Sequence, residues 1–147
     1  MDYILDTNII LAYIRNSSLV KFLDKKYAPL EPENTPIISV VSIGEIESLA
    51  IRNQWGSKKN ELLQTLLNKF VVADINSNAI IKDYAKIDAF SQGKLKNVKS
   101  NFTARNMGKN DIWIAATASV LKIKLLTTDK DFNHLKDVFI DLEIIAI

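Results

Sequence analysis

The sequence contains no cysteine and a single histidine, His134. Without cysteine there are no disulfides, no thiolate metal sites and no cysteine nucleophile. A single histidine argues against a histidine-based zinc site and against a Ser-His-Asp hydrolase, so we interpret His134 as a surface or core residue. The four glycines form no G-x-x-x-x-G-K motif, which excludes a P-loop.

Long apolar runs are also missing. No stretch approaches the roughly 20 apolar residues that a membrane span needs, and the first residues, MDYILDTN, lack the basic and apolar regions of a signal peptide. We therefore expect a cytoplasmic protein with no membrane contact. A length of 147 residues predicts one domain, residues 1–147, large enough to bury a sizeable core.

The net charge of +2 is too small to indicate a nucleic-acid-binding protein, but its distribution is uneven. The 19 residues 92–110 carry five basic residues and no acid. This basic loop is either a solvated surface loop or an arm that contacts phosphates, and the sequence leaves both readings open. Phe102 within it either stacks on a base or tethers the loop. The candidate RNA-binding residues are Lys94, Lys96, Lys99, Arg105 and Lys109.

Apolar strand-like segments alternate with segments of helical periodicity along the chain. Because the strand segments are continuously apolar, they predict an α/β fold with a parallel sheet covered by helices on both faces. The predicted strands cover residues 3–5, 37–41, 70–72, 123–126 and about 139–146. The predicted helices cover about 8–15, 18–27, 42–53, 58–68, 77–91 and 111–121.

Four acidic residues, far apart in sequence, belong to one edge of this predicted sheet. Asp6 and Asp129 follow the ends of strands, whereas Glu45 and Asp111 lie in the first turns of helices. In a parallel sheet, helix N-termini and strand carboxyl ends share an edge, and open α/β sheets bind ligands there. Clustered carboxylates repel one another unless a hard cation such as Mg²⁺ lies among them.

Each acid also has a structural explanation. Ser42 and Glu45 fit a capping box, S-x-x-E, at a helix start. Asp111 could be an N-cap or a first-turn acid that the helix dipole favours. Thr128 and Asp131 give a similar helix-start signal. We therefore assign Asp129 to the metal site and Asp131 to the helix start, because residues two apart at this point should not face the same way.

Four motifs together resemble the PIN domain, specifically the VapC-type toxin ribonucleases of toxin–antitoxin pairs. They are residues 4–8 (ILDTN), 39–46 (SVVSIGEI), 110–118 (NDIWIAATA) and 126–132 (LTTDKDF). The resemblance covers essentially the whole chain. It implies five parallel strands in the order 3-2-1-4-5, a Mg²⁺- or Mn²⁺-dependent endoribonuclease acting on RNA such as tRNA or mRNA, and often a homodimer. It also implies an antitoxin whose C-terminal segment covers the active site.

By this resemblance, Asp6, Glu45, Asp111 and Asp129 are the catalytic and metal-binding acids. Asn8 and Thr127 match supporting polar positions that orient ligands or water. The family often has asparagine where this chain has Asp129, so the site here is more acidic. Glu47, two helical residues after Glu45, should face away from the site and be solvated. The basic loop is less typical of the family and is expected to influence the choice of RNA.

Two other functions fit parts of the sequence. The first is an RNA- or protein-binding module that keeps the fold without catalysis. The second is a phosphoryl-transfer domain of the receiver or phosphatase type, for which residues 70–74 (FVVAD) match only in part. A D-x-D phosphatase motif fails at residues 6–8 (DTN) and occurs only late in the chain, at residues 129–131 (DKD).

Overall fold

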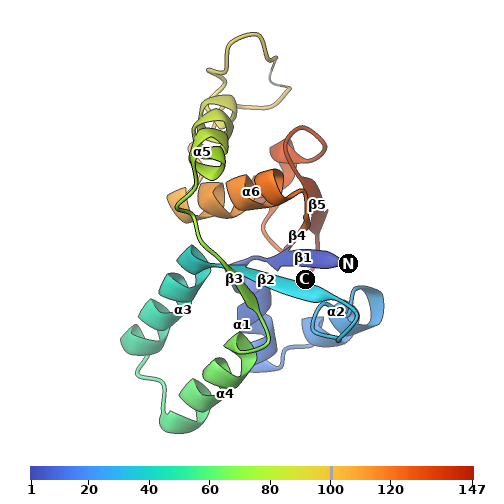
Figure 1. The fold of residues 1–147 in the computed structure, drawn as a ribbon, viewed down its shortest axis with the longest axis vertical. Helices are drawn as coiled ribbons and strands as arrows, with labels where there is room; N and C mark the ends of the chain where they lie inside the picture. Colours follow the sequence, from blue (N-terminus) through green and yellow to red (C-terminus); the bar gives the residue numbers. More distant parts are fainter. Residues whose placement is uncertain (100) are drawn as a thin grey trace.

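A computed structural model of the chain describes residues 1–99 and 101–147, and Ser100 of the basic loop lies outside the described residues. Five parallel strands form one sheet in the order β3-β2-β1-β4-β5 (Figure 1). This confirms the α/β class and the 3-2-1-4-5 strand order. The strands are β1 (Asp2–Leu5), β2 (Thr35–Ser39), β3 (Val71–Ala73), β4 (Lys124–Thr127) and β5 (Asp141–Ile144).

Helices cover both faces of the sheet, as the apolar strands predict (Figure 1). One face carries α1 (Thr7–Arg15), α2 (Leu19–Lys26), α3 (Val40–Arg52) and α4 (Ser57–Leu67). The other face carries α5 (Asn78–Ser91), α6 (Lys109–Leu121) and the 3₁₀ helix η1 (Lys130–Leu135).

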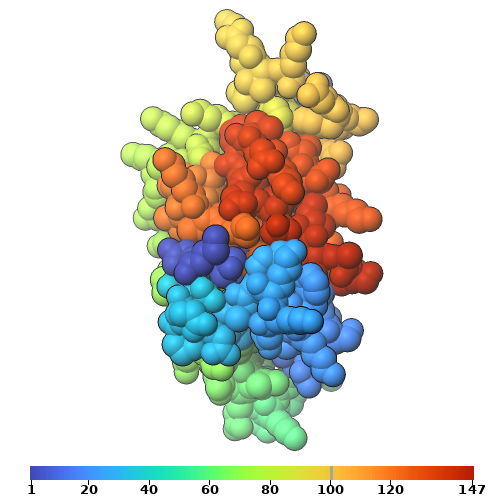
Figure 2. Space-filling model, turned by 90° about the vertical axis from the view of Figure 1, so that its right-hand side faces the viewer, coloured from blue at the N-terminus to red at the C-terminus, as the bar shows by residue number. Residues whose placement is uncertain are grey.

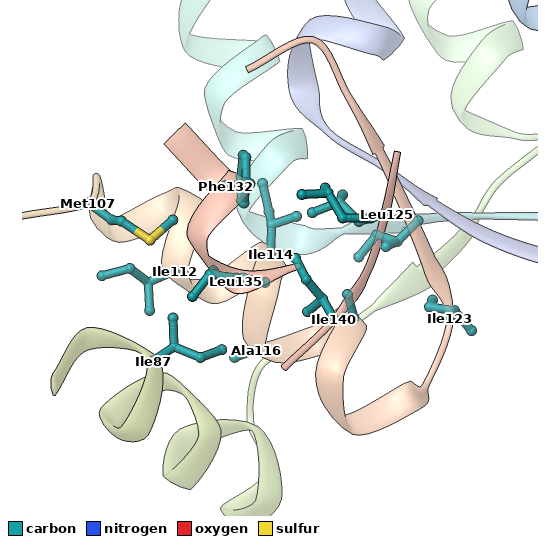
Figure 3. Packing of buried hydrophobic residues seen from close by; sticks show 14 of the residues in the cluster. Ile87, Met107, Ile112, Ile114, Ala116, Ile123, Leu125, Phe132, Leu135 and Ile140 are labelled. Carbon is teal, nitrogen blue, oxygen red and sulfur yellow. The ribbon is translucent and has the colours of Figure 1, made fainter. Parts of the chain in front are cut away.

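Consecutive residues of the central strands point to opposite faces of the sheet and belong to two separate hydrophobic cores. Ile4 and Leu125 pack with α5, α6 and η1, whereas Leu5 and Leu126 pack with α1, α2 and α4. The first core includes Ile112 and Ile114 of α6 and also Phe132 of η1 (Figure 3). The apolar positions of β1 and β4 are therefore buried on both faces of the sheet, and polar residues gather at its carboxyl edge.

Two expectations about strands and helices were wrong in detail. The second strand ends at Ser39, and α3 begins at Val40 rather than at Ser42. The cause is the Ser39 hydroxyl, which accepts a hydrogen bond from the Val41 N–H and caps the helix earlier. In β3, Val71 and Val72 are 55% and 51% exposed, because this edge strand pairs only with β2 and is not covered on both faces.

The basic loop projects beyond the end of α5, near the C-terminal part of the chain (Figures 1 and 2). Phe102 packs against the rings of Phe90 and His134, with centroid distances of 5.0 and 4.8 Å. The loop's backbone is tied back where the Arg105 N–H donates to the Ser91 carbonyl at 2.8 Å. Phe102 thus tethers the loop in the free protein.

Within the described residues, no helix is both long and apolar enough to span a membrane.

Candidate active site

Asp6 lies at the point where β1 ends and α1 begins, and its side chain is 4% exposed. Its Oδ1 accepts the Thr7 N–H at 2.8 Å, and its Oδ2 accepts the Thr127 hydroxyl at 2.7 Å. A helix-capping side chain usually accepts from the second or third helical N–H, whereas Asp6 accepts from the first. Capping alone therefore does not explain a carboxylate that is buried here and held at both oxygens.

Thr127 connects two of the predicted acids. Its fully buried hydroxyl donates to Asp6 and accepts the Asp129 N–H at 3.0 Å. Asp129 in turn caps η1, because its Oδ1 accepts the Asp131 N–H at 2.8 Å. One hydroxyl at the end of β4 thus fixes the carboxylate of β1 and the backbone that carries Asp129, which gives the predicted supporting residue a definite structural role.

Glu45 reaches the site from the second turn of α3, where it is half-buried. The capping-box interpretation of Ser42 and Glu45 was wrong, because both residues lie inside α3. Instead the Thr7 hydroxyl lies 2.9 Å from Oε1 of Glu45 and 2.9 Å from the Ser42 hydroxyl. Because a carboxylate only accepts hydrogen bonds, the Thr7 hydroxyl donates its single proton to the bond with Glu45, and its oxygen accepts a hydrogen bond from the Ser42 hydroxyl. Thr7 and Ser42 were not predicted as site residues.

Asp111 lies in the first turn of α6 and is half-buried. This confirms the expectation of a first-turn acid, a position that the helix dipole favours. Within the described residues it accepts no hydrogen bond. Gly108, the N-cap of α6, leaves space beside it, since a β-carbon there would lie 3.4 Å from Oδ2 of Asp111.

The four predicted acids influence one another electrostatically. Burial, and to a smaller extent Glu45 and Asp129, raise the pKa of Asp6 to about 6, although its hydrogen bonds with Thr127 and Thr7 oppose the shift. Burial raises the pKa of Asp111 to about 7, together with the negative charges of Asp6, Asp129, Glu45 and Asp131. Every charge acting on these two pKa values is an acid, as expected of carboxylates gathered at one edge.

The donor set fits a hard divalent cation, because it offers carboxylate and hydroxyl oxygens and concentrated negative charge. Within residues 1–99 and 101–147, no three acidic or histidine side chains converge into a ready-made metal cage. The acids nevertheless shift one another's pKa values, because electrostatic interactions act over longer distances than metal–ligand bonds. A closed cage is not required of Mg²⁺, which usually keeps several waters and uses one or two carboxylates.

The remaining polar predictions have mixed outcomes. The side-chain oxygen of Asn8 accepts the Thr128 N–H at a long 3.4 Å, so Asn8 links α1 to the turn after β4. The expected pairing of Thr128 with Asp131 was wrong, because Asp129 is the residue that caps η1. Glu47, expected to be solvated, is half-buried, and its Oε1 accepts a 3.4 Å hydrogen bond from Gln64 of α4.

The predicted RNA-binding residues divide into two groups. Lys99 and Arg105 line a hollow together with residues of η1, and Lys109 opens α6 two residues before Asp111. Lys94 and Lys96 are exposed, and no hydrogen bond links them to the acids within the described residues.

A fully parallel sheet covered by helices, with four acids at its carboxyl edge, defines a class of domain, and comparison with known proteins identifies it. The PIN domain model matches residues 3–138, and the chain belongs to the PIN domain family. Among curated relatives, "Ribonuclease VapC1" of Haemophilus influenzae, in strains R2866 and 86-028NP, is 26% identical over 139 residues. These residues are 94% of this chain and 95% of the relative.

Solved structures resemble the fold over nearly the full length of the chain. VapBC-1 from nontypeable Haemophilus influenzae has a TM-score of 0.73 and 24% identity, covering 98% of both chains. VapBC2 from Rickettsia felis, bound to a DNA fragment from its promoter, has a TM-score of 0.69 and 21% identity, also covering 98% of both chains. At these identities the structures support the fold.

Proposed function

We propose that this PIN domain is a metal-dependent endoribonuclease and the toxin of a toxin–antitoxin pair. The observation that carries the proposal is the carboxylate group at the sheet edge, in which a nearly fully buried Asp6 is held at both oxygens beside other acids. The ionised form of a buried carboxylate beside other negative charges is unfavourable without a compensating cation. Carboxylates with perturbed pKa values are frequent at functional sites. Family membership and the similarity to ribonuclease VapC1 agree with this function.

In this proposal Asp6, Glu45, Asp111 and Asp129 would hold Mg²⁺ or Mn²⁺, directly or through water. When bound, the ion would supply a water molecule of lowered pKa and positive charge beside the scissile phosphate. The chain contributes positioning: Thr127 fixes Asp6, and Thr7 fixes Glu45. In-line attack by water breaks the bond to the 3′ oxygen, leaving a 5′-phosphate and a 3′-hydroxyl.

The partners follow from the same reasoning. The substrate is RNA, for which the basic residues Lys94, Lys96, Lys99, Arg105 and Lys109 provide backbone contacts. Several structural relatives are VapBC complexes, and we propose a cognate antitoxin for this chain as well. The cytoplasm, where such RNA is present, is the proposed location.

The decisive experiment compares matched aspartate variants in an RNA cleavage assay with Mg²⁺ or Mn²⁺. Asp6 and Asp2 lie at opposite ends of β1, and Asp2 is exposed at the edge away from the acids. Asp6→Asn and Asp111→Asn should abolish cleavage, whereas Asp2→Asn should retain it. Mapping RNA 5′ ends, with circular dichroism to check folding, gives both the activity and the cleaved sequence. Full activity in folded Asp6→Asn or Asp111→Asn would exclude the assignment.

The same assay distinguishes a catalytically silent binding module. Such a module would bind RNA or protein without metal-dependent cleavage, and its affinity for Mg²⁺ would not depend on Asp6 or Asp111. The presence of all four family acids argues for catalysis. Metal titration by calorimetry, with wild type and Asp111→Asn compared, measures this dependence directly.

A further inference from the structure

A hollow of about 870 Å³ lies between the basic loop and η1, beside the candidate active site. It is lined by three aromatic residues, three aliphatic residues, three basic residues, one acid and two amides. We propose that this hollow is a base-binding subsite that holds an RNA base next to the cleavage site and favours bases carrying an exocyclic amino group. The proposal rests on the endoribonuclease function above and adds a specificity-determining surface to it.

One wall of the hollow is aromatic. The ring of Phe102 is half-buried, with Phe90 and His134 beside it. His134 is fixed by a 2.7 Å hydrogen bond between its Nε2 and the Ser91 hydroxyl. Aromatic faces of this kind stack with bases of single-stranded RNA, and this stacking provides affinity for a base in any sequence.

Part of the lining is basic. Lys99 of the basic loop and Lys130 of η1 line the hollow and are exposed, and the Arg105 guanidinium lies 6.0 Å from the centre of the Phe102 ring. The Arg105 Nε is buried without a hydrogen-bond partner among the described residues, so the donors of this side chain are not fully used in the free protein. Cations beside an aromatic wall suit a nucleotide, in which a flat base is joined to a phosphate.

Asp131 connects the hollow to the acidic edge. Asp131 lines the hollow, and its backbone N–H donates a hydrogen bond to the Asp129 side chain. The negative charge of Asp131 also contributes to the raised pKa of Asp111. One lining residue of the hollow is therefore bonded directly to a candidate metal-binding acid. A strand with its scissile phosphate at these acids would bring an adjacent nucleotide to the hollow.

The polar residues on η1 account for base preference. Asp131 and Asn133 both line the hollow, and η1 is anchored by the fully buried Phe132 and Leu135 (Figure 3). A carboxylate accepts hydrogen bonds but does not donate them, so Asp131 can pair with the amino group of cytosine or adenine. Uracil has no exocyclic amine, and this predicts weaker binding of uridine at the subsite.

The test measures RNA binding separately from cleavage. Fluorescence anisotropy is recorded for labelled oligo-C and oligo-U with the full chain carrying Asp111→Asn, in Mg²⁺, so that the RNA stays intact. Phe102→Leu retains an apolar side chain but removes the aromatic face, and Phe102→Tyr restores it. Trp55→Leu is the matched control, because Trp55 also lies beside a cation, Lys59 Nζ at 4.3 Å, but at the junction of α3 and α4.

The expected result is that Phe102→Leu weakens oligo-C binding at least about fivefold. This corresponds to the lower end of the binding free energy that one base–aromatic stack contributes. Phe102→Tyr and Trp55→Leu should remain within about twofold of the parent. Asp131→Ala should reduce the preference for oligo-C over oligo-U. Because this ratio does not depend on Phe102, it also decides the case if Phe102→Leu does not fold.

Two results would overturn the subsite: folded Phe102→Leu binds RNA as tightly as the parent, or Phe102→Tyr loses as much RNA affinity as Phe102→Leu. The hollow would then be a candidate surface for a protein partner instead. An unchanged C-to-U ratio in Asp131→Ala would overturn the base preference. Failure of the proposed function looks different. In that case the wild-type chain cleaves no RNA with Mg²⁺ or Mn²⁺, while RNA binding still depends on Phe102 and supports the subsite.

Discussion

Replacing Asp6 with asparagine should stabilise the metal-free protein at pH 8. Burial and neighbouring acids raise the pKa of Asp6 from 3.8 to about 6, and a difference of two units corresponds to about 3 kcal/mol of destabilisation of the folded state when Asp6 is ionised. Asparagine cannot accept from both Thr7 and Thr127, which costs about 1 kcal/mol. The expected net gain is therefore about 2 kcal/mol in the free energy of unfolding.

The effect has a defined dependence on pH. Because the folded-state pKa of Asp6 is raised, the destabilisation of wild type is complete above about pH 6. It decreases as the pH falls through 6, since the folded protein then binds a proton that the unfolded chain does not yet bind, and it disappears below 3.8. Asp6→Asn should lose its advantage over wild type across this range.

Urea unfolding in EDTA at pH 8 and at pH 4.5, for wild type, Asp6→Asn and the control Asp2→Asn, measures these differences. Asp2→Asn removes an exposed carboxylate from the other end of β1, where no pKa shift of Asp6 or Asp111 originates. If Asp6→Asn is less stable than wild type at pH 8, the carboxylate is not a destabilising group. The argument that a cation compensates it would then be refuted.

Three further changes test the positioning of the acids and the core beneath them. Thr127→Val removes the hydroxyl that donates to Asp6 and should lower the free energy of unfolding by about 1–3 kcal/mol, whereas Thr127→Ser should restore it in urea unfolding. Thr7→Val should leave the thermal midpoint nearly unchanged but weaken Mg²⁺ binding by about 10–100-fold in calorimetry, because Glu45 loses its donor. Phe132→Ala should cost about 3–5 kcal/mol of stability, measured by urea unfolding, because its ring is fully buried. An effect of less than 1 kcal/mol would show that η1 is not anchored by that ring.

The edge of the sheet could be predicted from sequence because two simple rules determine it. Continuous apolar runs around Ile4 and Leu125 require a sheet covered on both faces, and parallel strands bring their carboxyl ends together. The positions of Asp6 and Asp111 then follow from the strand end and the helix start alone. The raised pKa values of both acids agree with this placement.

The supporting interactions could not be predicted in the same way. Thr7 and Ser42 are 35 residues apart in sequence, and only the packing of α1 against α3 brings their hydroxyls to 2.9 Å. The helix start at Val40 was missed because Ser39 and Ser42 are equally suitable caps in sequence. Val72 was taken for a covered strand residue, since an edge strand and a central strand of three apolar residues look alike without their neighbours.

The position of Thr127 explains how the edge of the sheet can hold acids in a fixed arrangement. β1 and β4 pair with Leu5 opposite Leu126, and the Asp6 N–H extends this ladder to the Leu126 carbonyl at 3.0 Å. The next residue of β4 is Thr127, whose hydroxyl therefore lies beside Asp6 because of strand register alone. A β-branched side chain suits this strand end, and its hydroxyl donates to one acid while accepting from the backbone of the next. Sheet register thus determines the spacing of Asp6 and Asp129, which the side chains alone would not maintain against their mutual repulsion.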